Sequence, residues 1–235
     1  MTGPVLHEEV PVVAAWDETA ALRGLRLALP PTFVAAHVRP GQVVKIRTEH
    51  GEGFFALANA PDPAGAAELL VKRGGRVADT AIARAEPGAG LSLTPPFGKG
   101  FPVADADGRD VLLFAAGSAI GPIRALVQHF VRHRPRYGRI TLFYGQRHGA
   151  EFAYLREHLD WERHGVRVVL CPSREDDAWL GVRGRVQEVA RTLAFGGSPP
   201  GDAVAFVSGM TAMVDDVHRT LAEAGIPPGR VHANF

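Results

Sequence analysis

Residues 112–130 read LLFAAGSAIGPIRALVQHF, an apolar run that passes through a turn of mostly small residues into an amphipathic segment. The turn consists of Gly117, Ser118, Ala119, Ile120, Gly121 and Pro122. It matches neither the GxGxxG fingerprint nor the Walker A spacing. A turn between a strand and a helix needs only one permissive residue, so four small ones indicate that a ligand approaches the backbone here. A turn packed closely against its neighbours explains the same residues equally well.

The chain beyond residue 108 continues this alternation of strands and helices. Strands are predicted at 111–116, 139–145, 166–171, 203–208 and 230–235, and helices near 122–133, 151–160, 185–194 and 211–224. Such alternation predicts a doubly wound α/β domain with a parallel five-stranded sheet, which binds ligands at the edge where its strands end. The residues at four of these ends are mostly small, polar or cationic: Gly117-Ser118, Gly145-Gln146-Arg147, Pro172-Ser173-Arg174 and Ser208-Gly209-Met210.

The first hundred residues have a different pattern, in which proline and glycine separate short strand-like runs. These runs lie at 10–16, 22–29, 42–48, 54–60, 68–73 and 90–94. They predict a small antiparallel β-barrel. Because the pattern changes after residues 105–110, the sequence predicts two domains, 1–107 and 108–235.

Composition excludes several classes of function. With 26 Lys and Arg against 25 Asp and Glu, the net charge of +1 disfavours binding to nucleic acid or to an anionic membrane. A single cysteine excludes an internal disulfide framework and a cysteine-held iron-sulfur cluster, and ten scattered histidines predict no metal site. The acidic start and the lack of an eighteen-residue apolar stretch predict a cytoplasmic protein without a membrane span.

Five segments, in this order, resemble the ferredoxin-NADP reductase superfamily over nearly the whole chain. VRPGQVVKIR at 38–47 resembles the barrel segment with Pro-Gly-Gln, and GSAIGPI at 117–123 the nicotinamide-phosphate turn. YGQR at 144–147 and SREDDAWLGVRGRV at 173–186 resemble the next two strand ends. VSGMTAMVDDVHRTL at 207–221 resembles the family's Cys-Gly-Pro segment.

The resemblance implies an FAD-dependent NAD(P)H oxidoreductase. Hydride passes between a nicotinamide nucleotide and FAD, and the electrons continue to a separate acceptor, a protein or a small molecule. The alternative is a nicotinamide-binding sensor or subunit that has lost its flavin site.

The flavin motif departs from the family's pattern. In GFFALANAP at 53–61, Gly53 replaces the arginine that pairs with the FAD pyrophosphate, and Phe55 replaces the tyrosine that lies against the isoalloxazine. Ala78 replaces a serine that faces the flavin phosphate. Losing an ionic hydrogen bond weakens FAD binding by roughly 1.5–3 kcal/mol unless another cation replaces the arginine. Lys72, Arg73 and Arg76 are the candidates for this replacement, and the alternative is that such charges only solvate a strand end. Residues expected at FAD are Phe55, Ala56, Leu57, Asn59, Lys72, Arg73, Gly75, Arg76, Val77 and Ala78.

The resemblance also implies two catalytic residues. Ser208 stands where many members have a cysteine beside the reacting carbon, and Gly209, Met210 and Met213 belong to the same segment. Phe235 corresponds to a terminal aromatic residue that covers the flavin ring, although a residue that plugs the core is the alternative.

Cations near two strand ends bear on the choice of nicotinamide nucleotide. Five residues lie near positions where NADP-using relatives bind the 2′-phosphate: Arg147, Ser173, Arg174, Arg183 and Arg185. A 2′-phosphate needs cations that NADH does not, so the segment favours NADP over NAD. Arginines that only solvate a loop are the alternative.

Overall fold

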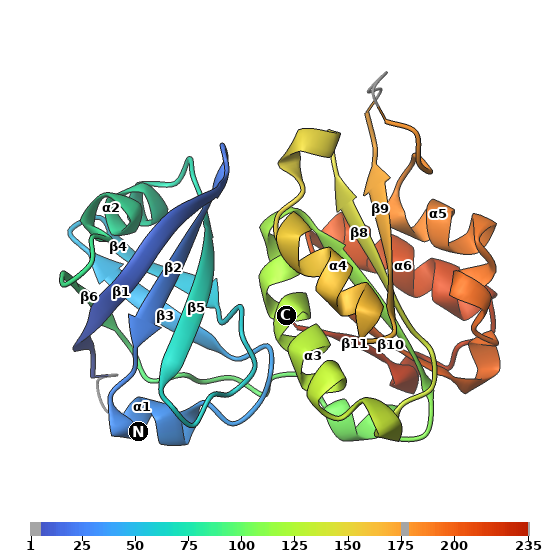
Figure 1. The fold of residues 1–235 in the computed structure, drawn as a ribbon, viewed down its shortest axis with the longest axis horizontal. Coiled ribbons are helices and arrows are strands. Elements are labelled where there is room, and N and C mark those ends of the chain that lie inside the picture. Colours follow the sequence, from blue (N-terminus) through green and yellow to red (C-terminus); the bar gives the residue numbers. More distant parts are fainter. Residues whose placement is uncertain (1–5, 175–178, 235) are drawn as a thin grey trace.

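The computed structural model describes residues 6–174 and 179–234, which form two sheets lying side by side (Figure 1). The first sheet contains β1 (Glu8–Thr19), β2 (Leu22–Ala28), β3 (Val43–Thr48), β4 (Gly51–Ala56), β5 (Ala66–Lys72) and β6 (Gly90–Leu93). These strands are antiparallel in the order β4-β3-β6-β1-β2-β5. A bridge between Leu57 and Leu69 joins the two ends of this order and closes the predicted barrel.

Two short helices of the barrel region were absent from the sequence prediction. Helix α1 (Pro31–Ala36) begins at a proline, which suits the first helical position, and buries Phe33. Helix α2 (Arg76–Arg84) buries Ala81 and packs Ile82 against the barrel core. With nine residues it is shorter than the stretch over which an apolar period identifies a helix, so tertiary packing reveals this helix better than its sequence does.

The second sheet contains β7 (Asp110–Ala116), β8 (Ile140–Gln146), β9 (Val166–Pro172), β10 (Ala203–Ser208) and β11 (Val231–Ala233). All neighbours are parallel, in the order β11-β10-β7-β8-β9. The predicted five-stranded parallel sheet is therefore confirmed. Strand order switches between β7 and β10, the kind of position where open α/β sheets bind ligands.

Helices cover both faces of this sheet. Helices α3 (Ile120–Arg132) and α4 (Leu155–Arg163) pack on one face, and α5 (Val186–Thr192) and α6 (Thr211–Glu223) pack on the other. Helix α4 begins later than the predicted residue 151, because residues 149–151 form a separate 3₁₀ turn. Tyr154 then takes a left-handed conformation with φ of 61° directly before the helix.

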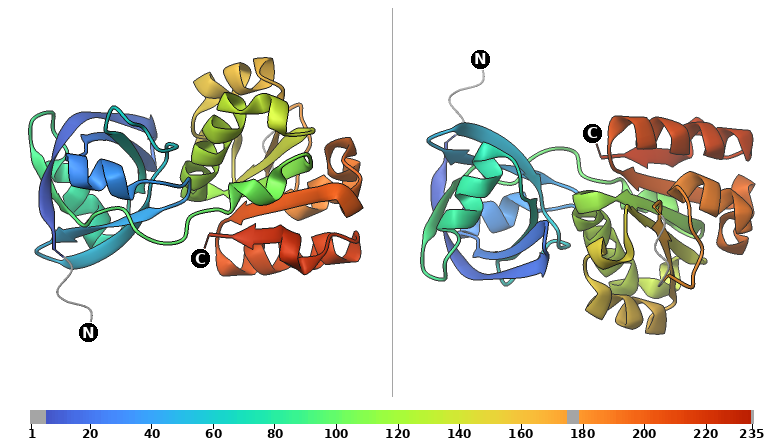
Figure 2. Two further views of the ribbon diagram at one scale, coloured as in Figure 1. Left: turned by 90° about the horizontal axis from the view of Figure 1, so that it is seen from below. Right: turned by 90° about the horizontal axis from the view of Figure 1, so that it is seen from above.

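Helix α3 lies on the side of the sheet that faces the barrel (Figure 2). The connection between the sheets includes a 3₁₀ turn at Val103–Ala106. Just before that turn, Phe101 meets Phe206 of β10 edge to face, with ring centroids 5.6 Å apart. Among the helices of residues 6–174 and 179–234, none has the length and apolar character that crossing a bilayer requires.

Candidate functional site

The ends of the parallel strands meet at one edge of the second sheet. In the parallel register, Ser208 pairs with Ala115, Ala116 with Gly145, and Gly145 with Cys171. The predicted strand-end residues of β7, β8, β9 and β10 therefore lie along a common edge. Cys171 is buried there, and burial raises the pKa of its thiol to about 12.

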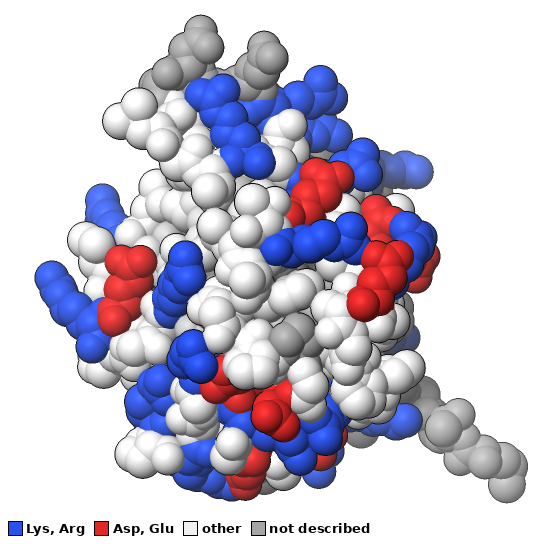
Figure 3. All heavy atoms as spheres, turned by 90° about the vertical axis from the view of Figure 1, so that its right-hand side faces the viewer, with Lys and Arg blue, Asp and Glu red and all other residues white. Residues whose placement is uncertain are grey.

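A charged hollow of about 450 Å³ lies at the β8 and β9 end of this edge. Its lining residues are Arg147, Ser173, Arg174, Gly184, Arg185 and Glu188. Figure 3 views the α5 and α6 side, where Lys and Arg gather at the upper end above a band of mixed charge. The backbone N–H of Arg174 donates to the carbonyl of Arg147 at 2.9 Å, which holds the two strand ends together.

Of the five residues predicted to bind the 2′-phosphate, Arg183 is the one that does not line the hollow. Its guanidinium donates to the carbonyl of Trp179 at 2.9 Å. The hollow instead contains Glu188, which no sequence motif indicates. Its carboxylate accepts from the backbone N–H of Arg185 at 3.3 Å. Spacing alone could not separate Arg183 from Arg185, because the direction of each side chain depends on how this loop folds.

The turn after β7 contains two glycines that are needed for different reasons. Gly117 has φ of 61°, and a side chain added there would meet nothing within 4 Å. Gly121 is buried, and a Cβ added there would lie 3.3 Å from the Cβ of Ala58 in the barrel. An approaching ligand therefore has access to the backbone at Gly117, whereas Gly121 is small because helix α3 packs closely on the barrel.

The remaining residues of the turn divide in the same way. Ser118 and Ala119 are half-buried and lie in a 3₁₀ turn with Gly117. Ile120 and Pro122 are buried residues in the first turn of helix α3. Ligand contact by side chains is thus restricted to the first half of the predicted segment.

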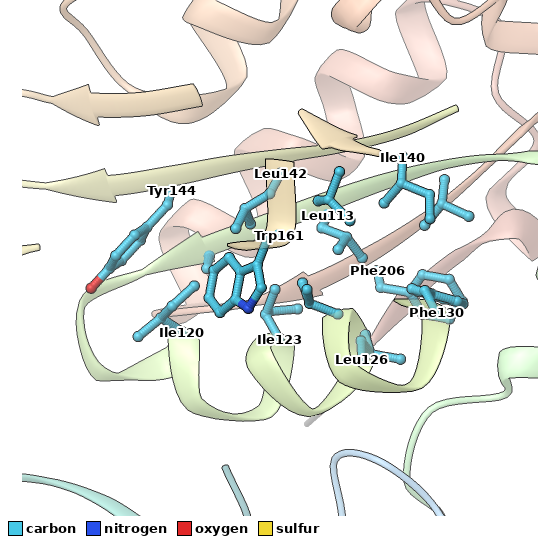
Figure 4. Packing of buried hydrophobic residues seen from close by; sticks show 14 of the residues in the cluster. Leu113, Ile120, Ile123, Leu126, Phe130, Ile140, Leu142, Tyr144, Trp161 and Phe206 are labelled. Carbon is cyan, nitrogen blue, oxygen red and sulfur yellow. The ribbon is translucent and has the colours of Figure 1, made fainter. Parts of the chain in front are cut away.

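The hydroxyl of Tyr144 holds this turn from behind (Figure 4). It donates to the carbonyl of Gly117 at 3.3 Å and accepts from Gln146 Nε2 at 2.8 Å and from the backbone N–H of Ala153 at 3.2 Å. Burial raises the pKa of Tyr144 to about 12, so the hydroxyl keeps the proton it donates. The sequence predicts a strand end at YGQR, at 144–147, but carries no signal for this function of its tyrosine.

The segment after β10 contains one buried and one exposed candidate. Ser208 is only 3% exposed, whereas Met210 is 75% exposed. A Cβ on Gly209 would lie 2.5 Å from Sδ of Met213, so this glycine makes room for a methionine that packs against the core. Phe235 lies outside the described residues.

The end of β11 lies against the barrel segment that contains Pro-Gly-Gln. A Cβ on Gly41, which has φ of 84°, would lie 2.5 Å from the Phe101 ring and 3.0 Å from Oδ1 of Asn234. Gln42 braces the segment, since its Oε1 accepts from the backbone N–H groups of Val38 and Arg39 at 2.7 and 2.9 Å. The edge of the parallel sheet therefore reaches the barrel.

The residues expected at the flavin lie on and after β4. Phe55 pairs with Val44 on the inward side of the barrel and packs against its core. A Cβ on Gly53 would lie 3.0 Å from the Phe55 ring and 3.1 Å from Val77, so these side chains occupy the space beside Gly53. The exposed aromatic side chain of β4 is Phe54, whose ring lies 6.1 Å from that of Phe97.

Ala56, Leu57 and Asn59 are enclosed to different degrees. Ala56 is half-buried and Leu57 is fully buried. The Asn59 amide donates to the carbonyls of Ala60 and Ala66 at 3.0 and 2.9 Å, and its oxygen accepts from the backbone N–H of Glu68 at 2.7 Å. The polar atoms of the Asn59 side chain thus have their hydrogen-bond partners within the barrel, and no ligand is needed to account for this residue.

The expected replacement cations lie around the start of α2. Arg73 forms an ion pair with Asp17, with 2.6 Å between Nη2 and Oδ1. Lys72 and Arg76 are exposed, and Gly75 precedes the helix. Ala78 and Val77 are half-buried, and Ala78 packs against the barrel core.

Comparison with known proteins supports the resemblance found in the sequence. A model of the oxidoreductase NAD-binding domain matches residues 113–219. The structure titled ferredoxin reductase in carbazole 1,9a-dioxygenase covers 100% of this chain, which spans 70% of that one, with a TM-score of 0.81 and 25% identity. In its NAD-binding domain and in its fold, the chain matches the ferredoxin-NADP reductase superfamily.

Further relatives match this chain in sequence or in fold. The sulfhydrogenase 1 subunit gamma of Pyrococcus furiosus is 30% identical over 181 residues, which are 75% of this chain and 61% of that protein. The ferredoxin–NAD(+) reductase component of the alkene monooxygenase system of Xanthobacter autotrophicus is 28% identical over 57% of this chain and 42% of that protein. A ferredoxin NADP+ reductase from Neisseria gonorrhoeae with bound FAD and NADP has a TM-score of 0.80 at 19% identity, covering 99% of this chain and 100% of that one. The chain thus spans less than two thirds of the length of these two curated relatives.

Proposed function

We propose that this chain is an FAD-dependent NAD(P)H oxidoreductase that passes electrons to a separate acceptor. The observation that carries the proposal is the accessible backbone at Gly117, at the carboxyl edge of a parallel sheet that also reaches the barrel. Bound FAD supplies the ability to accept a hydride and to release its electrons onward. In this proposal residues 1–107 hold FAD and residues 108–235 hold the nicotinamide nucleotide.

The nicotinamide nucleotide is proposed to bind along the edge of the second sheet. Gly117 and Ser118 offer backbone N–H groups to the pyrophosphate, and the Tyr144 hydroxyl keeps the carbonyl of Gly117 turned toward the protein interior. Ser208 and Phe235 are proposed to lie at the reacting ring. The burial of Ser208 supports a role in excluding water beside that ring.

NADPH is the proposed electron donor because of the cationic hollow. Arg147, Arg174 and Arg185 outnumber Glu188 among its charged lining residues, so the hollow favours a 2′-phosphate. The site is open to solvent, and each exposed arginine contributes about 0.5–1 kcal/mol, or roughly two- to fivefold in affinity.

A pair of matched variants tests this choice. We expect Arg174→Gln to raise the Michaelis constant for NADPH two- to fivefold and to leave that for NADH unchanged. Arg183→Gln is the control, since Arg183 bonds to the Trp179 carbonyl outside the hollow. Equal effects of the two substitutions, or equal losses with NADPH and NADH, contradict the assignment of the hollow.

The barrel residues fit FAD with an altered set of contacts. The start of α2 offers backbone N–H groups, and Arg76 lies at its first helical position, where a phosphate is favoured. Phe55 and Val77 offer an apolar surface beside Gly53, in the space that an arginine would otherwise take. We therefore propose that Arg76 provides the charge that Gly53 lacks.

Titration of the purified protein with FAD, followed by quenching of flavin fluorescence, tests the flavin site. We expect saturable binding that weakens about tenfold in Arg76→Gln, the loss of one charge-assisted hydrogen bond. Arg84→Gln at the other end of α2 is the control, because Arg84 pairs with Glu49 on the surface. Reduction of the bound flavin by NADPH then tests the reaction itself.

The second candidate is a nicotinamide-binding sensor or subunit without flavin. Gly53 and Ala78, which stand where the resemblance implies an arginine and a serine at the flavin phosphates, favour this candidate. For this candidate we expect the protein to bind NADPH but to show no saturable binding of FAD in the same titration.

A further inference from the structure

The helix that begins at the nicotinamide turn is attached directly to the barrel segment that carries the flavin motif. Gly121, in the first turn of α3, packs against Ala58. One helical turn on, Arg124 Nη1 donates to the carbonyl of Ala58 at 2.8 Å. Further along the helix, Gln128 Oε1 accepts from the backbone N–H of Ala60 at 2.9 Å. Three successive turns of α3 therefore contact residues 58–60.

Arg124 also joins two carboxylates from different parts of the fold. Its Nη1 lies 2.7 Å from Oε2 of Glu68 on β5 of the barrel. Its Nε lies 2.8 Å from Oε2 of Glu157 on α4, within the nicotinamide half. The guanidinium carbon stands 4.7 Å from the centre of the Tyr154 ring. The guanidinium thus has one anionic partner on each side of the junction.

The pair that crosses the junction is the more deeply buried one. The side chains of Arg124 and Glu68 are each 9% exposed, compared with 34% for Glu157. Glu68 is held on its other side by Arg26, with 2.7 Å between Nη2 and Oε1. A buried ion pair adds little net stability over an apolar contact of the same shape, but its hydrogen bonds have fixed directions. These directed hydrogen bonds therefore fix the position of α3 relative to the barrel.

We propose that Arg124 and Glu68 are positioning residues that set the nicotinamide turn at a fixed distance from the flavin segment. The consequence for catalysis rests on the proposed function, since hydride transfer depends steeply on the separation of the reacting atoms: a misplacement of about 1 Å costs about a hundredfold in rate. Neither side chain contacts the reacting groups in this proposal. Their effect passes through α3 to Gly117 and through residues 58–60 to Phe55.

The two partners of Arg124 provide a matched pair of variants. Glu68→Gln removes the charge that crosses the junction and keeps the shape of the side chain. Glu157→Gln removes the charge on the other partner of the same arginine and leaves the junction intact. Both variants are compared at a temperature where both are fully folded.

Hydrogen exchange in the protein without cofactors provides the first readout. The N–H of Ala60 bonds to Gln128 on α3, so its exchange reports whether the helix is docked on the barrel. We expect exchange in residues 58–60 to be at least fivefold faster in Glu68→Gln and unchanged in Glu157→Gln. Equal exchange in the two variants overturns the proposal, whether or not the protein is an oxidoreductase.

Stopped-flow reduction of the FAD-loaded protein by NADPH provides the second readout. At saturating NADPH we expect the reduction rate constant to fall about ten- to a hundredfold in Glu68→Gln, with the dissociation constants of FAD and NADPH within twofold of the wild type. Glu157→Gln should keep the wild-type rate constant within about threefold. A Glu68→Gln variant that reduces at the wild-type rate overturns the positioning role, and so does one whose whole loss lies in NADPH affinity.

If the Glu68→Gln protein does not fold, a second substitution tests the same proposal. Gln128→Leu removes the acceptor of the Ala60 N–H without disturbing a charge. It should change exchange and reduction rate in the same directions by a smaller factor. If the wild type is not reduced by NADPH at all, the proposed function fails, and the exchange measurement alone decides whether Arg124 and Glu68 hold the junction.

Discussion

Tyr144→Phe tests how the turn at Gly117 is held. The substitution removes one hydroxyl and keeps the ring, which packs edge to face on Phe152 with centroids 5.0 Å apart. Three polar groups lose their partner: the carbonyl of Gly117, Nε2 of Gln146 and the N–H of Ala153. Because the ring remains, cavity formation makes no contribution to the change.

The cost follows from the fate of these three groups. Ala153 is fully buried, and an unsatisfied buried N–H costs about 1–3 kcal/mol. Gln146 keeps its bond to the carbonyl of Glu151 at 2.9 Å, and the bond to Gly117 is long at 3.3 Å, so these two add about 0.5–1 kcal/mol together. We expect the free energy of unfolding to fall by about 1.5–4 kcal/mol in total.

Two measurements check the prediction. Urea denaturation gives the change in stability, and an NADPH titration gives the affinity, which should weaken several-fold because the turn is no longer held. Tyr137→Phe is the control, since its hydroxyl has a 3.2 Å contact with Nε2 of His129 and the residue precedes the start of β8, whereas the turn follows the other end of β7. A loss below about 0.5 kcal/mol in Tyr144→Phe, together with unchanged NADPH affinity, refutes the reasoning.

Three further predictions concern the turn, the histidines and the cysteine. Gly117→Val places a branched side chain at φ of 61°, so it should raise the Michaelis constant for NADPH sharply and leave FAD binding unchanged; an unchanged Michaelis constant contradicts ligand approach at this turn. Burial lowers the pKa of His37, His129 and His158 to about 4, below the unfolded value near 6.5. The unfolded chain then binds more protons in this interval, so the melting temperature should fall as pH drops from about 6.5 toward 4, and replacing His158 by Gln should flatten that fall. Burial raises the pKa of the Cys171 thiol to about 12, so iodoacetamide should label it only after unfolding, and rapid labelling of the folded protein would show that the site is accessible.

The sequence alone determined the architecture of the parallel sheet. Buried strands such as 203–208 are continuous apolar runs, because a parallel sheet is covered on both faces, and the amphipathic stretch after Pro122 has the period of a helix packed on one side. These signals are local, so the predicted ends of β7, β8, β9 and β10 agree with the structure within one residue. Helix α2 is not predicted because its nine residues are too few for an apolar period to identify a helix.

The tertiary structure alone decided what each candidate residue of the site faces. Gly117 and Gly121 look equivalent in the sequence, yet one faces open space and the other faces the barrel. Arg124 looks like a solvated helix residue, but its carboxylate partner Glu68 is 56 residues away in the chain. Pairings of this kind form only when the barrel docks on the sheet, and a local sequence pattern encodes the period of an element, not the partner that covers it.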